Sequence, residues 1–192
     1  MKRTLLIALR MTVVSLLALG VVYPLVVTGI ARLAFPRAAA GSLVEKHGAV
    51  IGSEHIGQSF ETDRYFHSRP SAAGNGYDAM ASSASNLGPT SQLLVDDVGR
   101  RVDAVVSQEV GARSGEVPVD LVTSSGSGLD PDISPDSAML QVQRVARVRG
   151  LDADVLRELV RSHIHERQFG LLGERRVNVL ELNLALDALS SR

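Results

Sequence analysis

The sequence predicts a single N-terminal transmembrane helix followed by an α+β soluble domain. No charged residue interrupts the 21 residues between Arg10 and Arg32, and 11 of them are Leu, Ile or Val. Beyond residue 37 no second apolar run approaches this length, and patterns typical of helices, short strands and polar loops follow one another. The chain is therefore expected to have one membrane span and one folded domain of ordinary size.

The uncharged segment has the length and composition of a bilayer-spanning helix. At about 1.5 Å per residue it reaches about 31 Å, close to the thickness of the hydrocarbon core. Its branched aliphatic residues favour insertion by about 3 to 7 kcal/mol. Pro24 is tolerated in a span when neighbouring groups satisfy the carbonyl that it frees. We predict a cytoplasmic tail at 1–10, a transmembrane helix at 11–33 and an extracytoplasmic α+β domain at 38–192.

The orientation follows from the distribution of charge. Three basic residues precede the span, Lys2, Arg3 and Arg10, and Arg32 and Arg37 follow it, so the positive-inside rule mildly favours a cytoplasmic N-terminus. A cleaved signal peptide, with Ala38–Ala40 as the cleavage site, is the alternative. Secretory apolar regions usually run only about 7 to 15 residues, which favours a retained span.

Charge and composition exclude several function classes. Four of the 20 basic residues and none of the 21 acidic ones lie in residues 1–35, so the remaining chain carries a net charge of −5. There is no Cys, which excludes disulfides, thiolate metal sites and cysteine nucleophiles. Neither of the two lysines, Lys2 and Lys46, follows a glycine-rich loop or lies in an Asp-Lys-Thr sequence, which excludes a phosphate-loop lysine and a phosphorylated-aspartate ATPase motif. No catalytic residue of the chain's own is predicted.

The first half of the domain reads as short strands, then a long loop, then a helix. Glycines break residues 42–60 into short strands and turns, whereas 67–90 is rich in Ser, Gly, Asn and Pro and shows neither periodicity. Thr90 or Ser91 can cap a helix whose apolar residues recur three or four apart until Gly111. Residues 117–123 alternate as a strand does, and a loop over 124–133 follows.

The second half of the domain is predicted to be mainly helical. Ser134 followed by Pro135 starts a helix that ends at Gly150. Asp152 opens another, expected to stop near Gly170. Residues 178–189 alternate like a strand, but Asn178 with Glu181 resembles a capping box and favours a helix. The expected core is aliphatic, with aromatic anchors at Phe60, Tyr65, Phe66, Tyr77 and Phe169.

Several polar constellations could carry chemistry, and each has a plainer interpretation. Asp130, Asp132 and Asp136 lack the Gly and Glu of a calcium loop and are expected to cap a helix, so no metal site is predicted. The Ser-Gly run at 124–128 lacks the lysine of a phosphate loop. His163 and His165 would lie on different faces of a helix.

A basic stretch follows Gln141. Six arginines lie between 144 and 167, interleaved with acidic residues, which favours ion-paired helix faces over a nucleic-acid site.

No independent active site is recognised in the sequence. The chain is therefore interpreted as a subunit, with a membrane-anchored extracytoplasmic enzyme or binding protein acting alone as the alternative.

Five sequence blocks carry a family resemblance: YFHSRPSA at 65–72, SNLGPT at 85–90, VPVDLVT at 117–123, SGSGLDP at 125–131 and NVLELNLALD at 178–187. Behind one N-terminal span, they resemble the C-subunit family of the bacterial Kdp potassium-transporting ATPase over nearly the whole chain. The sequence departs from the family at Asp132, where His or Asn is frequent.

The resemblance implies a role in high-affinity potassium uptake. The implied partners are a channel-like potassium-binding subunit, a P-type ATP-hydrolysing subunit and a small single-span subunit, in the bacterial plasma membrane and without nucleic acid. It also implies that the chain is needed for assembly and acts as a catalytic chaperone that raises the ATP affinity of the hydrolysing subunit. No cofactor of the chain's own is implied, and ATP and potassium are handled by the complex.

One residue is assigned a nucleotide effect by the resemblance. It falls on Gln141, for which we favour the interpretation of an ordinary exposed helix residue. An extracytoplasmic domain could not touch ATP, so any effect on affinity would be coupled through the complex.

Overall fold

The computed structural model describes residues 1–46 and 48–190. The chain divides into two compact units, Met1–Ile51 and a second unit that begins at Gly52. The prediction of a single long apolar helix followed by an α+β domain is confirmed.

The first unit contains one long helical segment. α1 (Lys2–Leu17), a π-helical turn (Ala18–Val22) and α2 (Tyr23–Ala34) form a helix of 33 residues that is long and apolar enough to cross a membrane. It includes the predicted span 11–33 and residues 2–10 as well. The assignment of residues 1–10 as a cytoplasmic tail stays a prediction.

The π-helical turn ends two residues before Pro24. The backbone N–H of Tyr23 donates to the carbonyl of Ala18, five residues earlier, instead of four as in an α-helix. Proline carries no N–H and its ring crowds the preceding turn, which a wider turn accommodates. A short helix, α3 (Pro36–Ala39), follows the long helix. β1 (Leu43–Lys46) and β2 (Ala49–Ser53) then form a two-stranded sheet, which agrees with the short strands predicted in this part of the chain.

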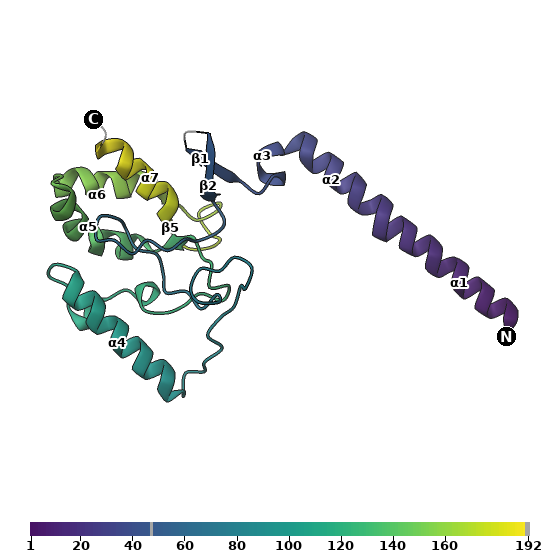
Figure 1. Ribbon diagram of the computed structural model, residues 1–192, viewed down its shortest axis with the longest axis horizontal. Coiled ribbons are helices and arrows are strands. Elements are labelled where there is room, and N and C mark those ends of the chain that lie inside the picture. Colours follow the sequence, from purple (N-terminus) through teal and green to yellow (C-terminus); the bar gives the residue numbers. More distant parts are fainter. Residues whose placement is uncertain (47, 191–192) are drawn as a thin grey trace. The chain divides into compact units, whose positions relative to one another are not determined.

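The core of the second unit lies between three helices and a small antiparallel sheet. α5 (Pro135–Arg149), α6 (Ala153–Ser162) and α7 (Val179–Ser190) pack on β3 (Asp132–Ile133), β4 (Ile164–His165) and β5 (Arg176–Asn178). The strand order is β3-β5-β4, and Val177 at the centre pairs with Ile133 on one side and Ile164 on the other. Figure 1 shows α5, α6 and α7 grouped together, with α4 (Gln92–Gln108) running separately on the other side of this unit.

Several predicted helix boundaries are confirmed by cap geometry. The Ser134 hydroxyl accepts a hydrogen bond from the N–H of Ser137 at 3.1 Å, and Gly150 ends α5 in the left-handed conformation. The side chain of Asp152 caps α6. The amide oxygen of Asn178 accepts from the N–H of Glu181, as a capping residue does, so the helical interpretation of 178–189 is confirmed.

The predicted strand over 117–123 is wrong. Two short 3₁₀ turns, Ser114–Glu116 and Val119–Leu121, occupy this region. Pro118 cannot donate a ladder hydrogen bond, and the carboxylate of Asp120 accepts from the N–H and hydroxyl of Ser134 at 2.7 and 3.0 Å. The alternation therefore reflects one side of an irregular segment that supports the start of α5.

The helix after Asp152 is shorter than predicted. It ends at Ser162, and Ile164–His165 forms β4, so the placement of His163 and His165 on one helix is also wrong. The chain between β4 and β5 makes a hairpin turn instead of a further helical turn. Phe169, expected as a core anchor, lies in that turn and is 92% exposed.

Of the other predicted anchors, Phe66 is fully buried, and Phe60 and Tyr65 pack against the core. Tyr77, within the long loop, is only partly buried. The core residues themselves are mainly aliphatic, as expected: Phe66, Ile133, Ala138, Val142, Val145, Ala146, Leu156, Val160, Val177, Val179, Leu182 and Leu186.

Candidate functional site

Gln141 lies inside the domain and not on its surface. Its exposed fraction is 1%, so the prediction of an ordinary exposed helix residue is wrong. On α5 the residues at Ala138, Gln141, Val142 and Val145 share one face because they follow the helical spacing of three and four. That face points into the core, and it takes the amide of Gln141 with it.

The amide group of Gln141 clamps the backbone of His67. Its Oε1 accepts from the His67 N–H at 2.7 Å, and its Nε2 donates to the His67 carbonyl and to the Ser137 carbonyl, both at 3.2 Å. Oε1 also accepts from Nη2 of Arg144 at 2.7 Å. A glutamine amide has two donor hydrogens and two acceptor lone pairs, so every hydrogen-bonding position is in use.

Arg144 is the largest fully buried side chain and joins three segments. Nε donates to Oε1 of Glu109 at 2.7 Å, at the end of α4, while Nη1 donates to the carbonyls of Asp63 and Tyr65 at 2.7 and 2.9 Å. With Gln141 these contacts form what we call the arginine cluster, Gln141–Arg144–Glu109 with the backbone of 63–67. Pairing and hydrogen bonding offset the cost of burying charges of this kind.

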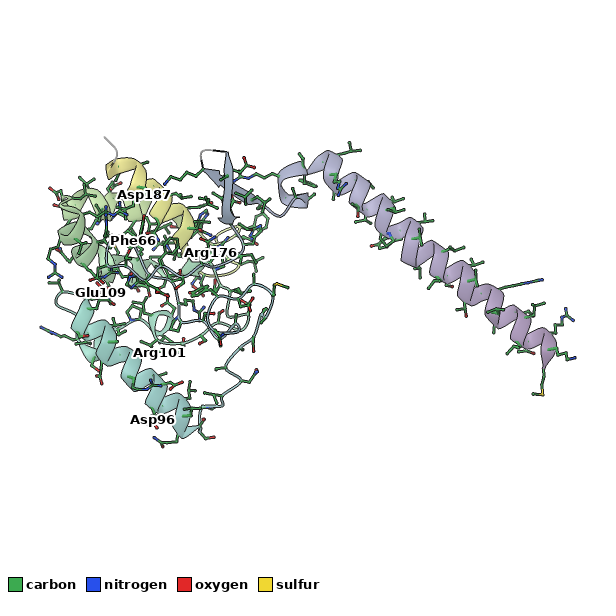
Figure 2. All side chains as sticks on the ribbon, viewed as in Figure 1. Phe66, Asp96, Arg101, Glu109, Arg176 and Asp187 are labelled. Carbon is green, nitrogen blue, oxygen red and sulfur yellow. The ribbon has the colours of Figure 1, made fainter. Side chains whose placement is uncertain are left out.

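Glu109 carries the one buried carboxylate oxygen of the arginine cluster without a hydrogen-bond partner, Oε2. Figure 2 shows Glu109 at the end of α4 that points toward α5, with Asp96 at the opposite end. Burial raises the pKa of the Glu109 carboxyl, and the charge and hydrogen bond of Arg144 oppose this rise without cancelling it.

A pocket of about 190 Å³ adjoins this cluster. α4 forms one wall through Arg101, Val105 and Gln108, and the cluster contributes Gln141 and Glu109. His67 and Ser68 form the wall on the side of the loop. The pocket is small and mixes a few polar groups with an aliphatic lining.

His67 completes the surroundings of the cluster. Its ring nitrogen Nε2 lies 3.1 Å from the carbonyl of Thr62. Burial, and then the positive charge of Arg144, lower the pKa of the His67 imidazole below its ordinary value of 6.5. A neutral ring donating to Thr62 fits both observations.

The long loop 67–90 contains no helix or strand, as predicted, but it is pinned to the Ser-Gly run at 124–128. The hydroxyl of Ser71 donates to the carbonyl of Gly128 at 2.6 Å, and the N–H of Ser83 donates to the carbonyl of Ser127 at 3.0 Å. A Cβ at Gly128 would lie 2.5 Å from the carbonyl oxygen of Ser83, and its φ is +68°. These small residues thus allow two loops to approach each other.

The predicted capping role is wrong for Asp130 and Asp132, whereas Asp136 lies in the first turn of α5. Asp130 pairs with Arg69 at 2.7 Å and Asp132 with Arg176 at 2.9 Å, while Ser134 is the cap. Burial raises the pKa of the Asp132 carboxyl, an effect that Arg176 opposes. Within residues 1–46 and 48–190 no three His, Asp or Glu side chains are grouped to hold a metal ion, and the expected absence of a metal site stays a prediction.

The predicted ion pairing of the arginine-rich region is confirmed for several of its exposed members. Arg161 pairs with Glu158 on α6, and Arg157 pairs with Asp154. Arg144 and Arg149 instead point inward. Arg149 pairs with Asp187 of α7 at 2.9 Å, and its guanidinium lies 4.7 Å from the centre of the Tyr65 ring.

Sequence reasoning missed the partnership of Arg144 and Glu109. The available signal was an arginine at the helical spacing of a buried face, next to Val142 and Val145, and a glutamate between Val106 and Val110. Buried charges at such positions demand a partner, but a separation of 35 positions in the sequence hides which one.

The fold and the site define a class: a chain with one candidate membrane span and an α+β domain organised around a buried arginine cluster. A family model described as KdpC, the c chain of the K⁺-transporting ATPase, matches residues 5–188. The chain belongs to this family.

Curated relatives agree over nearly the full length. The chain is 57% identical over 185 residues to a potassium-transporting ATPase KdpC subunit of Gemmatimonas aurantiaca, covering 96% of this chain and 92% of that protein. It is 52% identical to the subunits of the same name from Koribacter versatilis (97% and 95% covered) and Mycobacterium tuberculosis (98% and 100% covered).

Proposed function

We propose that the chain is a non-catalytic subunit of a high-affinity, ATP-driven potassium uptake complex of the bacterial plasma membrane. Membership of the KdpC family is the observation that carries this proposal, since the relatives are named as subunits of a potassium-transporting ATPase. The proposed partners are a channel-like potassium-binding subunit, a P-type ATP-hydrolysing subunit and a small single-span subunit. ATP and potassium are handled by the complex.

The N-terminus is cytoplasmic and the domain from 38 to 192 extracytoplasmic in this proposal. The distribution of basic residues around the span supports this orientation. Protease treatment of intact and opened cells tests it, with an epitope at the C-terminus as the readout. Digestion in intact cells, after permeabilising only an outer membrane where one is present, is the expected result. Digestion only after rupture of the plasma membrane would place the domain in the cytoplasm.

The chain raises the ATP affinity of the hydrolysing subunit indirectly, as a chaperone-like subunit that holds the complex in a competent state. The position of Gln141 supports an indirect effect, because its amide has no hydrogen-bonding position left for a nucleotide. Gln141 would act by fixing His67 and Arg144. An effect of this kind is a coupling free energy between separate sites.

A paired substitution tests this role of Gln141. Gln141→Ala leaves the His67 N–H and one Arg144 N–H buried without acceptors, so a loss of about 2 to 4 kcal/mol in domain stability is expected. Gln143→Ala, on the exposed face of the same helix, is the matched control. In purified complexes, Gln141→Ala should lower both the apparent affinity for ATP in the hydrolysis assay and the thermal stability of the domain. Gln143→Ala should change neither. Weakened ATP affinity at full domain stability would indicate direct contact instead.

A second function, an anchored enzyme or binding protein acting alone, has the pocket beside Glu109 in its favour. Mild solubilisation of native membranes separates the two. Co-purification with an ATP-hydrolysing subunit supports the first proposal, and recovery as a solitary active monomer contradicts it.

A further inference from the structure

The hairpin between β4 and β5 presents apolar side chains to solvent. Phe169 is 92% exposed, Leu171 82% and Leu172 59%, and we call these three residues the hairpin tip. A folded domain normally buries side chains of this size, and contiguous exposed apolar patches mark interaction sites. Unlike the exposed apolar residues of the membrane helix, those of the hairpin tip belong to the water-soluble unit.

The hairpin tip is held in one conformation by its own backbone. The N–H of Gln168 donates to the carbonyl of Leu172 and the N–H of Leu172 donates back to the carbonyl of Gln168, both at 2.9 Å. Within this turn Phe169 has a φ of +54°, a left-handed conformation that is unusual for a bulky residue. Strain at a fully exposed aromatic side chain contributes nothing to the core, whereas a preorganised apolar anchor lowers the entropic cost of binding.

The stem of the hairpin is electrically neutral. Arg167 pairs with Glu174 at 2.5 Å, and Arg175 pairs with Glu166 at 2.9 Å, so two ion pairs of opposite polarity cross the hairpin. All four side chains are substantially exposed, and they lie in the stem next to the hairpin tip. This arrangement has the anatomy of a protein interface, with an apolar centre and a polar rim.

The neutral stem argues against a lipid surface as the occupant. The electrostatic attraction of a loop to anionic lipid comes from unpaired Lys or Arg, and here both arginines of the stem are matched by glutamates. The chain beyond residue 35 has a net charge of −5, which adds repulsion from anionic headgroups. A protein surface that is itself apolar and uncharged is complementary to such a tip.

The available area agrees with a protein partner. One exposed aromatic ring offers about 150 to 250 Å², and with the two leucines the hairpin tip offers on the order of 400 Å². A stable interface buries about 800 Å² on each side, so the tip can form its centre while the polar stem supplies the rim.

We propose that Phe169, Leu171 and Leu172 insert into an apolar, uncharged pocket on another protein subunit of the membrane complex. The proposal rests on the subunit function proposed above and names the surface by which the domain docks. Phe169 is the anchor, because aromatic residues at the centre of an interface carry most of the binding free energy.

The test uses the full chain in its native membrane. Phe169→Asn combined with Leu171→Asn removes the apolar centre, and Asn tolerates the left-handed conformation at 169. Retention of the chain on an affinity-tagged hydrolysing subunit should fall about tenfold or more, whereas Val119→Asn, at a 71% exposed site elsewhere, should retain wild-type levels. The thermal unfolding of the double variant should match that of the wild type, since both side chains are exposed.

A photoreactive amino acid at position 169 gives the second readout. Crosslinking to a protein subunit is expected, and crosslinking to lipid alone would overturn the proposal. Unchanged retention of the double variant, or a loss of its thermal stability, would also overturn it. If the wild-type chain itself is not retained, the subunit function fails; if the wild type is retained and the double variant equally so, only the docking surface fails.

Discussion

Removing the guanidinium of Arg144 is the most informative perturbation of the domain. Arg144→Met keeps a side chain of similar length and deletes the charge. The Glu109 carboxylate then stays buried without its counter-charge, and the carbonyls of Asp63 and Tyr65 lose their donor. Gln141 keeps only its contacts to His67 and to its own helix.

The expected loss of stability is large. Breaking a buried ion pair by removing one partner costs about 3 to 5 kcal/mol, and each carbonyl left unpaired adds about 1 kcal/mol or more. A total of at least about 5 kcal/mol is a large share of the 5 to 15 kcal/mol typical of a folded protein. At about 2 to 4 °C per kcal/mol for a domain of this size, the melting temperature should fall by about 10 to 20 °C.

The pH dependence of the variant identifies the cause. Because the folded-state pKa of Glu109 lies above its ordinary 4.5, ionisation of this group destabilises the folded state. Stability is therefore lost as pH rises from the ordinary value through the raised one, and regained as pH falls. Arg144→Met removes the charge that restrains this rise, so its deficit should be greatest at neutral pH and shrink on acidification.

Thermal unfolding of the full chain in detergent, followed by circular dichroism between pH 4 and 8, measures both effects. Arg147→Met, at an exposed position of the same helix, removes the same charge and should change stability by less than about 0.5 kcal/mol. Adding Glu109→Gln to Arg144→Met should restore part of the loss. A deficit below about 1 kcal/mol, or one that does not change with pH, would refute the account of the arginine cluster.

Three further predictions concern the loops around the cluster. Asp120→Ala removes the carboxylate that accepts hydrogen bonds from Ser134, the N-cap of α5. The free energy of unfolding, measured by chemical denaturation, should fall by about 1 to 2 kcal/mol, with Asp103→Ala as an exposed control. Gly128→Ala places a methyl group against backbone at a positive φ and should lower the melting temperature by several degrees, whereas Gly126→Ala, with open space around it, should not. Because the pKa of His67 is lowered in the folded state, stability is lost as pH falls from 6.5 through the folded-state pKa. His67→Gln removes this titration, so chemical denaturation of the variant at a series of pH values should show a flatter dependence of stability on pH.

Local signals account for the elements that were predicted correctly. The ends of α5 are encoded by Ser134, Pro135 and Gly150, whose backbone preferences act within one helical turn. The membrane helix follows from an uncharged apolar run alone. These features need no knowledge of the rest of the fold.

The mistaken elements depend on distant partners. Val119 and Leu121 alternate like strand residues, but no strand of the described chain pairs with them, and Asp120 serves α5 instead. Phe169 has the composition of a core residue and occupies a turn. A strand or a core position is defined by what lies across from it, which periodicity does not reveal.

The candidate site could be located only in part. The family resemblance pointed to Gln141, but its burial follows from contacts with His67, 74 residues away in sequence. Arg144 belongs to an arginine-rich stretch in which most other members, though not Arg149, are exposed, so composition suggested a solvated face. Long-range hydrogen bonding, and not residue type, distinguishes it from Arg147.

The π-helical turn at Ala18–Val22 has a consequence for the faces of the membrane helix. Successive residues of an α-helix are about 100° apart around the axis, and a wide turn inserts an extra residue into this progression. A stripe of side chains that begins in α1 does not continue along the same side of α2. The corresponding side-chain stripes of the two halves of one span thus face different directions. Each half can therefore pack against a different neighbouring helix.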